Sequence, residues 1–298
     1  MTLRSRYSVI IIGAGPTGLV LANLLGIERI STLLIERNMS TVAEPRAVSI
    51  DDETLRTLQA AGLIDTVLTQ VVQGYGAHYY DPRGRRFAIV QPMTREFGYY
   101  RRNAFRQPIL ESQLREGLAR FPHVDCRFQH RLETLNQDED SVTIGIRTVD
   151  GSLHSTRCDF LVGTDGASST VRERMGVFMS GNTFNERWLI VDLLGTPDRF
   201  RHTRVYCDPE RPAISLPGPG GTRRYEFMLH PHEQDENLLR EETVRELVGH
   251  RCEGDRDLSI VRKTVYTFHA RIAERWCAGR VFLAGDAAHL SPPFPDKV

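Results

Sequence analysis

The sequence VIIIGAGPTG at residues 9–18 decides the fold. Its first four residues are apolar and β-branched, which is typical of a strand buried in a parallel sheet. A glycine-rich segment follows this strand directly, and the mostly apolar residues 19–25 after it predict a helix. The chain therefore begins as a strand, a tight turn and a helix, which is the opening unit of many α/β folds.

The three glycines of this turn have separate physical roles. Gly13 permits a sharp turn after the strand, Gly15 lets a pyrophosphate approach the backbone, and Gly18 lets the helix pack close to the strand. Pro16 lies between the last two glycines in the same turn. A phosphate bound here faces the positive end of the helix, an interaction worth roughly 0.3 to 2 kcal/mol depending on burial.

A second β-branched strand, residues 32–35, ends in the acidic residue Glu36. Glu36 stands near the offset of about 20 residues at which such folds bind the ribose hydroxyls of adenosine. We interpret Glu36 and the following Arg37 as part of the same site. Strand, glycine turn, helix and acid together predict dinucleotide binding, and this pattern alone leaves NAD and FAD both open.

Two distant segments place a polar turn directly after an apolar strand. In the segment DFLVGTDGASSTVR, Gly166 tolerates the positive φ of a sharp turn and Asp165 accepts hydrogen bonds there. In the segment GRVFLAGDAAH, Gly285 and Asp286 occupy the same position after a strand. A purely structural Asp-Gly turn is the less favoured alternative for the first segment, and the combination with the N-terminal turn makes all four residues candidates for the site.

With these segments the whole chain resembles the class A flavoprotein monooxygenases, the family that includes 4-hydroxybenzoate hydroxylase. The segments EPRAV around Arg46 and RRNAFRQPILE around Gln107 resemble it too. The resemblance implies FAD as the cofactor, with Asp165 and Arg46 near its pyrophosphate, Gln107 at the flavin chain and Asp286 on a ribityl hydroxyl. A carboxylate suits that last role because a charge-assisted hydrogen bond contributes roughly 1.5 to 3 kcal/mol. His289 is interpreted as a structural or flavin-adjacent residue, since no nucleophile or metal ligand lies near it in the sequence.

The resemblance also implies an activity. NADH or NADPH would reduce FAD, and O₂ would then hydroxylate a phenol ortho to its hydroxyl group. The segments PRAVSIDDE, QPMTREFG and RRYEFM resemble the members that act on phenylpropionates, so the expected substrate is 3-(3-hydroxyphenyl)propionate or a related aromatic acid in aromatic catabolism. Open alternatives are a polyketide or antibiotic hydroxylase of the same family and a truncated, non-catalytic FAD-binding remnant. A halogenase is disfavoured because no Trp-x-Trp-x-Ile signature surrounds Trp188 or Trp276.

The strand pattern predicts two interleaved domains. Three short alternating segments, residues 132–138, 142–147 and 152–157, predict an antiparallel β-meander attached to the parallel sheet. The expected fold is thus an α/β, Rossmann-like FAD-binding domain with an interleaved α+β substrate domain of mostly antiparallel strands. The FAD-binding domain is predicted at residues 1–74, 100–186 and 269–298, and the substrate domain at 75–99 and 187–268.

Recognition of a substrate carboxylate favours arginine, because its guanidinium pairs in a bidentate manner. The candidates on predicted strands of the substrate domain are Arg204, Tyr206, Arg223 and Tyr225. Each arginine, Arg224 included, is more simply explained as a surface residue. Strand alternation puts Arg223 with Tyr225 on one face and Arg224 with Glu226 on the other, and the sequence does not reveal which face meets the flavin. No catalytic residue is assigned.

Composition narrows the partners further. Equal numbers of basic and acidic residues, 38 each, give no field that would gather nucleic acid or an anionic membrane. The five cysteines form no C-x-x-C pair, so neither a metal site nor a disulfide framework is indicated, and a cytoplasmic location fits. No segment reads as a signal peptide or a membrane-spanning helix, and the dominance of arginine over lysine indicates a bacterial source. The oligomeric state is not predicted.

The C-terminal sequence departs from the resemblance. After residues 291–294, SPPF, the family continues with a Gly-Gln-Gly loop and a long helix, whereas this chain ends in PDKV at residues 295–298. Such a helix would present backbone donors to the reduced flavin. We therefore expect a truncated chain that binds FAD weakly and turns over poorly or not at all.

Overall fold

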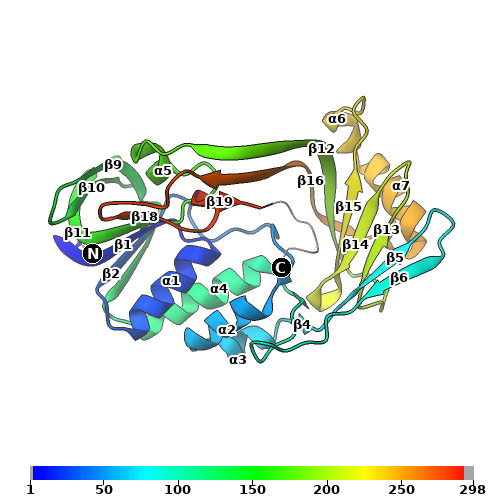
Figure 1. Ribbon diagram of the computed structural model, residues 1–298, viewed down its shortest axis with the longest axis horizontal. Coiled ribbons are helices and arrows are strands. Elements are labelled where there is room, and N and C mark those ends of the chain that lie inside the picture. Colours follow the sequence, from blue (N-terminus) through cyan, green and yellow to red (C-terminus); the bar gives the residue numbers. More distant parts are fainter. Residues whose placement is uncertain (1–2, 292–298) are drawn as a thin grey trace.

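The computed structural model describes residues 3–291, so the predictions for residues 292–298 lie outside the described part. Two lobes are joined by two long strands (Figure 1). One lobe is built on a largely parallel sheet with helices on one side. The other is a mostly antiparallel sheet backed by two helices (Figure 1).

The first sheet has the strand order β17-β18-β11-β1-β2-β8. All neighbours in this path run parallel except β17 and β18. The strands are β1 (Arg6–Ile12), β2 (Thr32–Glu36), β8 (Val124–Phe128), β11 (Leu153–Gly163), β17 (Cys277–Ala278) and β18 (Val281–Leu283). Strand β1 is β-branched and apolar at its centre, and both of its faces are covered.

Helices cover one face of this sheet. They are α1 (Pro16–Ile27), α2 (Asp52–Ala60), α3 (Ile64–Leu68) and α4 (Gln107–Gly117). Their buried side chains, such as Leu19 and Leu114, pack against Ile11 and Leu34 of the sheet. The burial of each such side chain stabilises the fold by about 1.5 to 3 kcal/mol. The strand and helix opening predicted from residues 9–25 is therefore confirmed.

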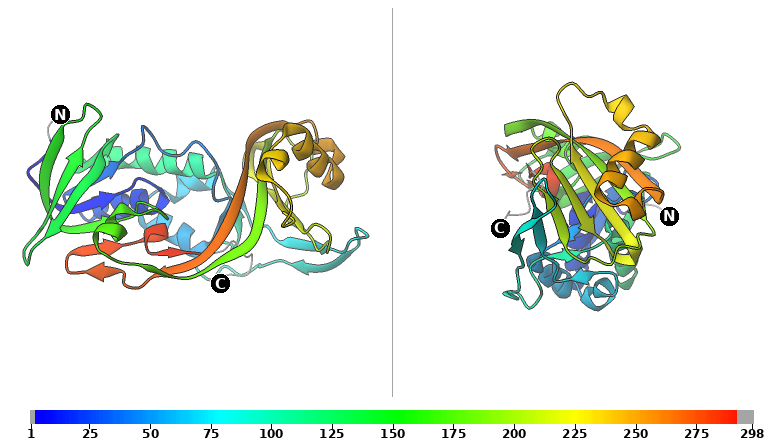
Figure 2. Two further views of the ribbon diagram at one scale, coloured as in Figure 1. Left: turned by 90° about the horizontal axis from the view of Figure 1, so that it is seen from above. Right: turned by 90° about the vertical axis from the view of Figure 1, so that its right-hand side faces the viewer.

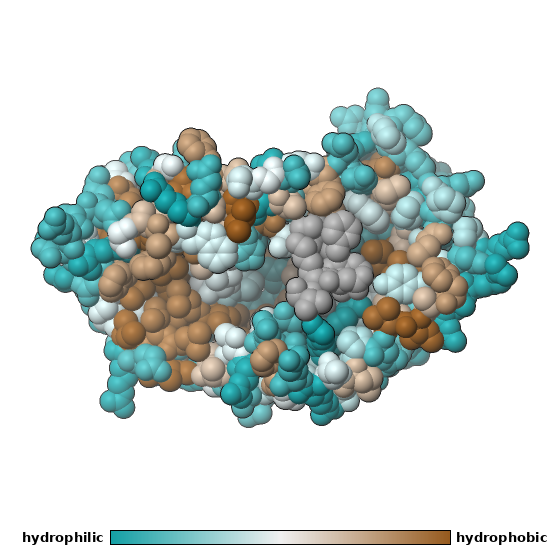
Figure 3. Space-filling model, viewed as in Figure 1, coloured by the Kyte–Doolittle hydropathy of each residue, from teal (hydrophilic) through white to brown (hydrophobic). Residues whose placement is uncertain are grey.

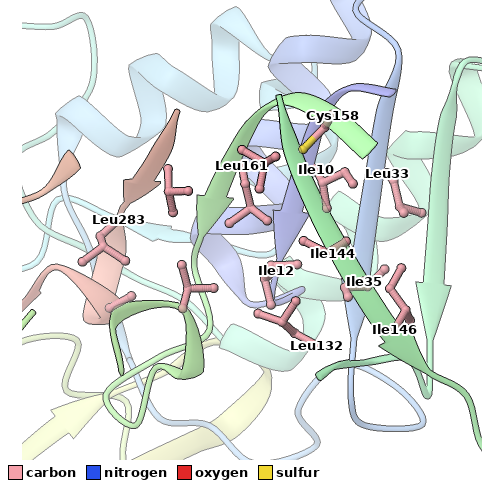
Figure 4. Packing of buried hydrophobic residues seen from close by; sticks show 14 of the residues in the cluster. Ile10, Ile12, Leu33, Ile35, Leu132, Ile144, Ile146, Cys158, Leu161 and Leu283 are labelled. Carbon is pink, nitrogen blue, oxygen red and sulfur yellow. The ribbon is translucent and has the colours of Figure 1, made fainter. Parts of the chain in front are cut away.

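The opposite face of the sheet is covered by strands β9 (Arg131–Gln137) and β10 (Val142–Arg147). Figure 4 shows how Ile144 and Ile146 of β10 pack over Ile10, Ile12 and their neighbours on the sheet. The predicted meander is present, with one difference. Its third strand and the following parallel strand form a single strand, β11.

The long strand β11 changes partners along its length. Residues 153–158 pair antiparallel with β10, whereas residues 157–163 pair parallel with β1. Cys158 belongs to both pairings, opposite Val142 on one side and Tyr7 on the other. The sequence changes from the mostly polar residues 152–157 to the apolar run after Asp159, so two separate strands were predicted where a single strand runs through.

The second sheet has the order β19-β16-β12-β15-β14-β13-β5-β6. Its strands are β5 (Ala77–Tyr80), β6 (Arg86–Val90), β12 (Met179–Leu194), β13 (Thr203–Tyr206), β14 (Ala213–Pro217), β15 (Thr222–Met228), β16 (Ser259–Ala273) and β19 (His289–Leu290). Helices α6 (Asp235–Leu238) and α7 (Glu241–Arg251) back this sheet on the side away from the first lobe (Figure 1). Phe227 and Val248 belong to the core between them.

Strands β12 and β16 form an antiparallel ribbon that reaches from one lobe to the other (Figure 2). Their pairing shifts register between Thr183 and Arg187. The proposed domain boundaries at 186/187 and 268/269 fall beside this irregularity, inside both strands. The two lobes therefore share continuous strands, and we keep the domain division as a proposal.

Shorter elements complete the structure. Strands β3 (Ser49–Ile50), β7 (Asn103–Ala104) and β4 (Val72–Gln73) form a small antiparallel sheet, and α5 (Thr170–Arg174) follows β11. Short 3-10 turns span η1 (Leu118–Arg120), η2 (Pro219–Gly221), η3 (Glu253–Asp255) and η4 (Gly285–Ala287). No helix among the described residues is long and apolar enough to cross a membrane. The mixed α/β fold class predicted from the sequence is confirmed.

Candidate cofactor and substrate site

A pocket of about 160 Å³ opens where β1, β2 and β11 end. Crevices at the carboxyl ends of parallel strands are the usual ligand sites of such sheets. Among the residues that line it are the predicted Gly13, Gly15, Glu36, Arg37, Arg46, Asp165 and Gly166. Three regions far apart in the sequence thus meet at one pocket.

The glycine turn has little room for side chains, except at one position. Gly13 has a φ of 106°, and a Cβ atom there would lie 2.5 Å from the carbonyl oxygen of Thr164. A Cβ atom on Gly18 would lie 2.0 Å from the carbonyl oxygen of Gly13. A Cβ atom on Gly15 would meet no atom within 4 Å. The open space above Gly15, where Pro16 starts α1, fits a pyrophosphate at the positive end of the helix.

Glu36 is held in place by backbone and side-chain donors. Its Oε2 atom accepts a hydrogen bond from the Ala14 N–H at 2.9 Å. Its Oε1 atom accepts bonds from the N–H and the side-chain amide of Asn38, at 2.9 and 2.7 Å. A carboxylate accepts about four hydrogen bonds, so Oε2 keeps one site for a ribose hydroxyl. Arg37 is exposed at the rim of the same pocket.

The Asp165 carboxylate caps the helix that follows it. It accepts hydrogen bonds from the Ser169 hydroxyl at 2.5 Å and from the Val171 N–H at 3.1 Å. Gly166 has a φ of 84°, as predicted for a sharp turn. The role of Asp165 in the structure is therefore to fix the turn, and the pocket is lined by the turn that results.

Arg172 joins this turn to the second acidic turn. Its guanidinium donates to the carbonyl oxygens of Ala167, at 2.7 Å, and Ala287, at 3.0 Å. Gly285 has a φ of 60°, and a Cβ atom there would lie 2.6 Å from the hydroxyl of Thr17 at the start of α1. The Asp286 turn therefore lies against the first turn of α1, beside the glycine turn.

Burial raises the pKa of Asp286, while the positive charges of His289 and Arg46 oppose that rise. Asp286 and Arg46, which stand at opposite ends of the sequence, are therefore neighbours. Asp286 is not among the residues that line the pocket of about 160 Å³. His289 stacks on Trp276 with ring centroids 5.7 Å apart, which fits the structural role expected for it.

Gln107 holds the loop that carries Arg46. Its side-chain oxygen accepts from the Ala47 N–H at 2.7 Å, and its amide donates to Glu111 at 2.8 Å. Glu111 also accepts from the Val42 N–H at 3.0 Å, and burial raises its pKa. Sequence reasoning missed Glu111, although it stands four residues after Gln107 on a predicted helix, where the two side chains share one face.

The four predicted substrate residues lie on a different face from the cofactor pocket. Register pairs Arg204 with Ser215 and Ser215 with Tyr225, and Tyr206 packs against the core beneath α7. Alternation places Arg223 on the same face. All four side chains therefore point to the side of the sheet that α6, α7 and the segment of Asp198 and Phe200 cover.

Burial corrects two of these predictions. Tyr225 is 0% exposed and donates its hydroxyl hydrogen bond to Asp255 at 2.7 Å. Arg223 is 2% exposed and donates to the carbonyl oxygens of Asp198 and Phe200. Neither residue offers surface to a substrate, and Arg223 is not the surface arginine expected from the sequence. These predictions failed because successive side chains of a strand point to opposite faces, and a shift by one residue exchanges the two faces of the sheet.

The other face of the sheet looks towards the cofactor lobe, and Arg224 connects the two. Its guanidinium pairs with both oxygens of Asp192, at 2.7 and 3.0 Å. It also donates to the carbonyl oxygens of Pro45 and Arg46 in the cofactor loop. Arg224 is 6% exposed, so the surface interpretation is wrong for this residue too.

Arg204 and Tyr206 are partly exposed, and their substrate role stays a prediction. Arg204 pairs with Asp198 and lies over the ring of Phe200, with 4.2 Å from its guanidinium carbon to the ring centroid. The guanidinium carbon of Arg251 lies 4.8 Å from the ring centroid of Tyr206. Both side chains already have partners on the α7 side of the sheet. No group of His, Cys, Asp and Glu among residues 3–291 forms a metal site.

The glycine turn and the acid after β2 define a dinucleotide-binding protein, to which the second sheet adds a second lobe. The sequence profile of the FAD binding domain family matches residues 6–295. The chain belongs to this family, and its cofactor is FAD.

Curated relatives agree with this assignment. The chain is 42% identical over 291 residues to 3-(3-hydroxy-phenyl)propionate/3-hydroxycinnamic acid hydroxylase of Burkholderia cenocepacia, covering 98% of this chain and 54% of the relative. Identity to the Escherichia coli enzyme of the same name is 42% over 284 residues, 95% of this chain and 51% of that enzyme. The chain thus spans about half the length of the curated relatives it matches.

Solved structures share the fold. The p-nitrophenol 4-monooxygenase of Pseudomonas putida superposes with a TM-score of 0.86 at 25% identity, covering 97% of this chain and 75% of that one. Aklavinone-11 hydroxylase, solved with FAD and aklavinone, superposes with a TM-score of 0.82 at 26% identity, covering 99% of this chain and 59% of that one. Both are similar to this chain across both lobes.

Proposed function

We propose that this chain forms the cofactor-binding and substrate-binding part of an aromatic hydroxylase that uses NADH or NADPH and O₂. The observation that carries the proposal is the pocket at the carboxyl ends of β1, β2 and β11, lined by the glycine turn, Glu36 and Arg46. The family match supports FAD as the ligand of this pocket. When bound, FAD supplies hydride acceptance and oxygen activation, chemistry that amino acid side chains lack.

The residues of the chain would bind and orient the cofactor. Backbone N–H groups at the start of α1 would receive the pyrophosphate, with the open space above Gly15 admitting it. Glu36 would accept a ribose hydroxyl and Asp286 a ribityl hydroxyl, while Arg46 would neutralise phosphate charge. Gln107 would act on the cofactor through the loop that it holds.

The proposed substrate is 3-(3-hydroxyphenyl)propionate or a related phenolic acid, hydroxylated ortho to its hydroxyl group in aromatic catabolism. The relatives from Burkholderia and Escherichia support this choice. A second candidate is a polycyclic phenol, which the likeness to aklavinone-11 hydroxylase favours. Five free cysteines, two of them exposed, fit our proposal of a cytoplasmic location. The proposal requires no nucleic acid and no membrane as partner.

The experiment is an assay of the chain saturated with FAD. Oxidation of NADH and of NADPH is followed with 3-(3-hydroxyphenyl)propionate and, separately, with a polycyclic phenol, and the product is identified by mass. A catechol from the phenylpropionate supports the first candidate, and turnover of the polycyclic phenol alone supports the second. FAD binding without any aromatic product in either assay would favour the non-catalytic alternative and contradict the proposal.

A further inference from the structure

A mixed apolar and polar surface covers the face of the second sheet that looks towards the cofactor lobe. We call it the lobe-facing surface and define it by Trp188, Ile190, Ile214, Leu216, Glu226 and Met228. Register supports the set, since Glu226 pairs with both Ile190 and Ile214, and Met228 pairs with Trp188. The surface of the molecule is hollowed between the two lobes (Figure 3).

Arg224 shows that this face meets the cofactor loop. It stands two residues before Glu226 on β15, so the two side chains point the same way. Its guanidinium donates to the carbonyl oxygens of Pro45 and Arg46. Pro45 and Val48 line a cavity of about 30 Å³ together with Leu216 and Arg224. Glu226 lies one step further along the same face, beyond the loop.

The two charged residues of this face differ in their partners. Arg224 donates hydrogen bonds to the Asp192 carboxylate and to two backbone carbonyl oxygens. Glu226 is only 13% exposed in its side chain, and its nearest opposite charge is the Arg224 guanidinium at 3.9 Å. Within residues 3–291 the Glu226 carboxyl receives no hydrogen bond, and burial raises its pKa. A largely buried carboxyl that receives no hydrogen bond from the described residues has unused hydrogen-bonding capacity.

We propose that Glu226 determines substrate specificity by accepting a hydrogen bond from the hydroxyl of a phenol on the lobe-facing surface, and by rejecting an aromatic acid whose carboxylate would lie there. This inference rests on the proposed function and names the group that recognises the phenol. The ring packs against Ile214 and Met228, which are partly exposed apolar neighbours of the carboxyl. A second carboxylate at the same point adds a like charge in a partly desolvated place, which disfavours binding.

Arg224 does not offset such a charge. The Arg224 guanidinium is the cation nearest to Glu226, and its charge is already neutralised by Asp192. If Arg224 left Asp192 to pair with a substrate carboxylate, the buried Asp192 carboxylate would lose its partner. A carboxylate carried by a substrate side chain therefore lies away from Glu226. The phenol end of the substrate is the end that this surface binds.

The test is calorimetric titration of the chain with 3-ethylphenol and with 3-ethylbenzoate, in the presence and absence of saturating FAD. A charge-assisted hydrogen bond contributes roughly 1.5 to 3 kcal/mol, which corresponds to about 10- to 100-fold in affinity. We expect the wild-type chain to bind the phenol at least about tenfold more tightly than the benzoate. E226L should weaken phenol binding about 10- to 100-fold. E226Q should weaken it less and should remove the discrimination against the benzoate.

The matched control is E241Q, which removes an exposed carboxylate on the opposite side of the sheet. It should change neither affinity. Equal phenol affinity in wild type, E226L and E226Q overturns the inference, and so does a wild-type chain that binds no phenol with or without FAD. Loss of FAD binding by the wild-type chain is a separate outcome, since it contradicts the proposed function while the titrations without FAD still test Glu226.

Discussion

The cofactor pocket and the lobe-facing surface are assembled in opposite ways. The pocket is made of short turns, each placed directly after a strand, so neighbouring residues in the sequence stay neighbours in the site. The lobe-facing surface takes single residues from separate strands, and only register brings Ile190, Ile214 and Glu226 together. Backbone geometry determines which residues meet in the pocket. Strand register and the alternation of side chains determine which residues meet on the lobe-facing surface.

The largest expected effect comes from the glycine turn, where one glycine is needed for packing and another for cofactor binding. Gly18→Val should abolish FAD binding and cost at least about 3 kcal/mol of stability, because its Cβ atom would approach the Gly13 carbonyl oxygen to 2.0 Å. Gly15→Ala should leave stability within about 0.5 kcal/mol, since nothing lies within 4 Å and its φ is −76°. It should still weaken FAD binding by roughly tenfold, because the methyl group occupies the space of the pyrophosphate.

Urea unfolding and FAD titration of both variants measure these two quantities. Equal loss of stability in Gly15→Ala and Gly18→Val would show that the turn has one role instead of two. Unchanged FAD affinity in Gly15→Ala would show that the cofactor passes elsewhere.

The contact between the regions is the next target. Asp192→Ala should cost about 3 to 5 kcal/mol, because it leaves the buried Arg224 guanidinium without its carboxylate. The double variant Asp192→Leu with Arg224→Met should recover most of this loss, since neither charge of the Asp192–Arg224 pair is then left without the other. Urea unfolding of the single and double variants checks it. A double variant no more stable than Asp192→Ala would mean that the pair is not the source of the cost.

Asp286→Asn should change binding and stability in opposite directions. FAD affinity should fall about 10- to 100-fold, because a charged acceptor is lost. The pKa of Asp286 is raised in the fold by burial, so the folded state holds its proton to higher pH than the unfolded state. Stability of the wild-type protein without FAD therefore falls as pH rises through the interval between the ordinary and the raised pKa, and is recovered below it.

The neutral amide avoids this loss. Without FAD, Asp286→Asn should be more stable than wild type at neutral pH, and the difference should vanish once the pH is below the ordinary pKa of aspartate. Thermal unfolding across a pH series measures the difference. A variant less stable than wild type at neutral pH would contradict the assignment of the pKa shift to burial.

The smallest effect tests the corrected face of the second sheet. Tyr225→Phe should cost about 1 to 2 kcal/mol, because the Asp255 carboxylate loses a buried donor. The affinity for 3-ethylphenol should not change, since Tyr225 lies beneath α7. Thermal unfolding and calorimetry measure the two quantities. Weaker phenol binding at unchanged stability would restore Tyr225 as a substrate residue.

The fold was largely predictable because hydrophobic periodicity reports local structure. The apolar β-branched run before Gly13 and the alternating residues 142–147 both became strands, as predicted. Strand β11 was divided in the prediction because its residues change from mostly polar to apolar near Cys158, where the strand changes partners without a turn. Pairing across a sheet depends on residues far away, which a local pattern does not contain.

The site residues divide in the same way, into those that a local pattern predicts and those that depend on distant parts of the chain. Gly13, Glu36 and Asp165 were selected because turns after strands have characteristic residues, and the three residues line one pocket. Glu111 was missed because its burial depends on the loop of Val42, which the helix pattern does not reveal. Tyr225 was selected by residue type alone, and only the position of α7 shows that its face is covered.

The central claim is that the chain binds the adenosine and pyrophosphate end of FAD at the glycine turn. Titration of the purified chain with FAD, followed by quenching of flavin fluorescence, tests it most directly, with ADP and riboflavin as competitors. The structure predicts saturable binding of one FAD per chain, displaced by ADP and not by riboflavin. No binding of FAD, or binding that riboflavin displaces and ADP does not, would contradict it.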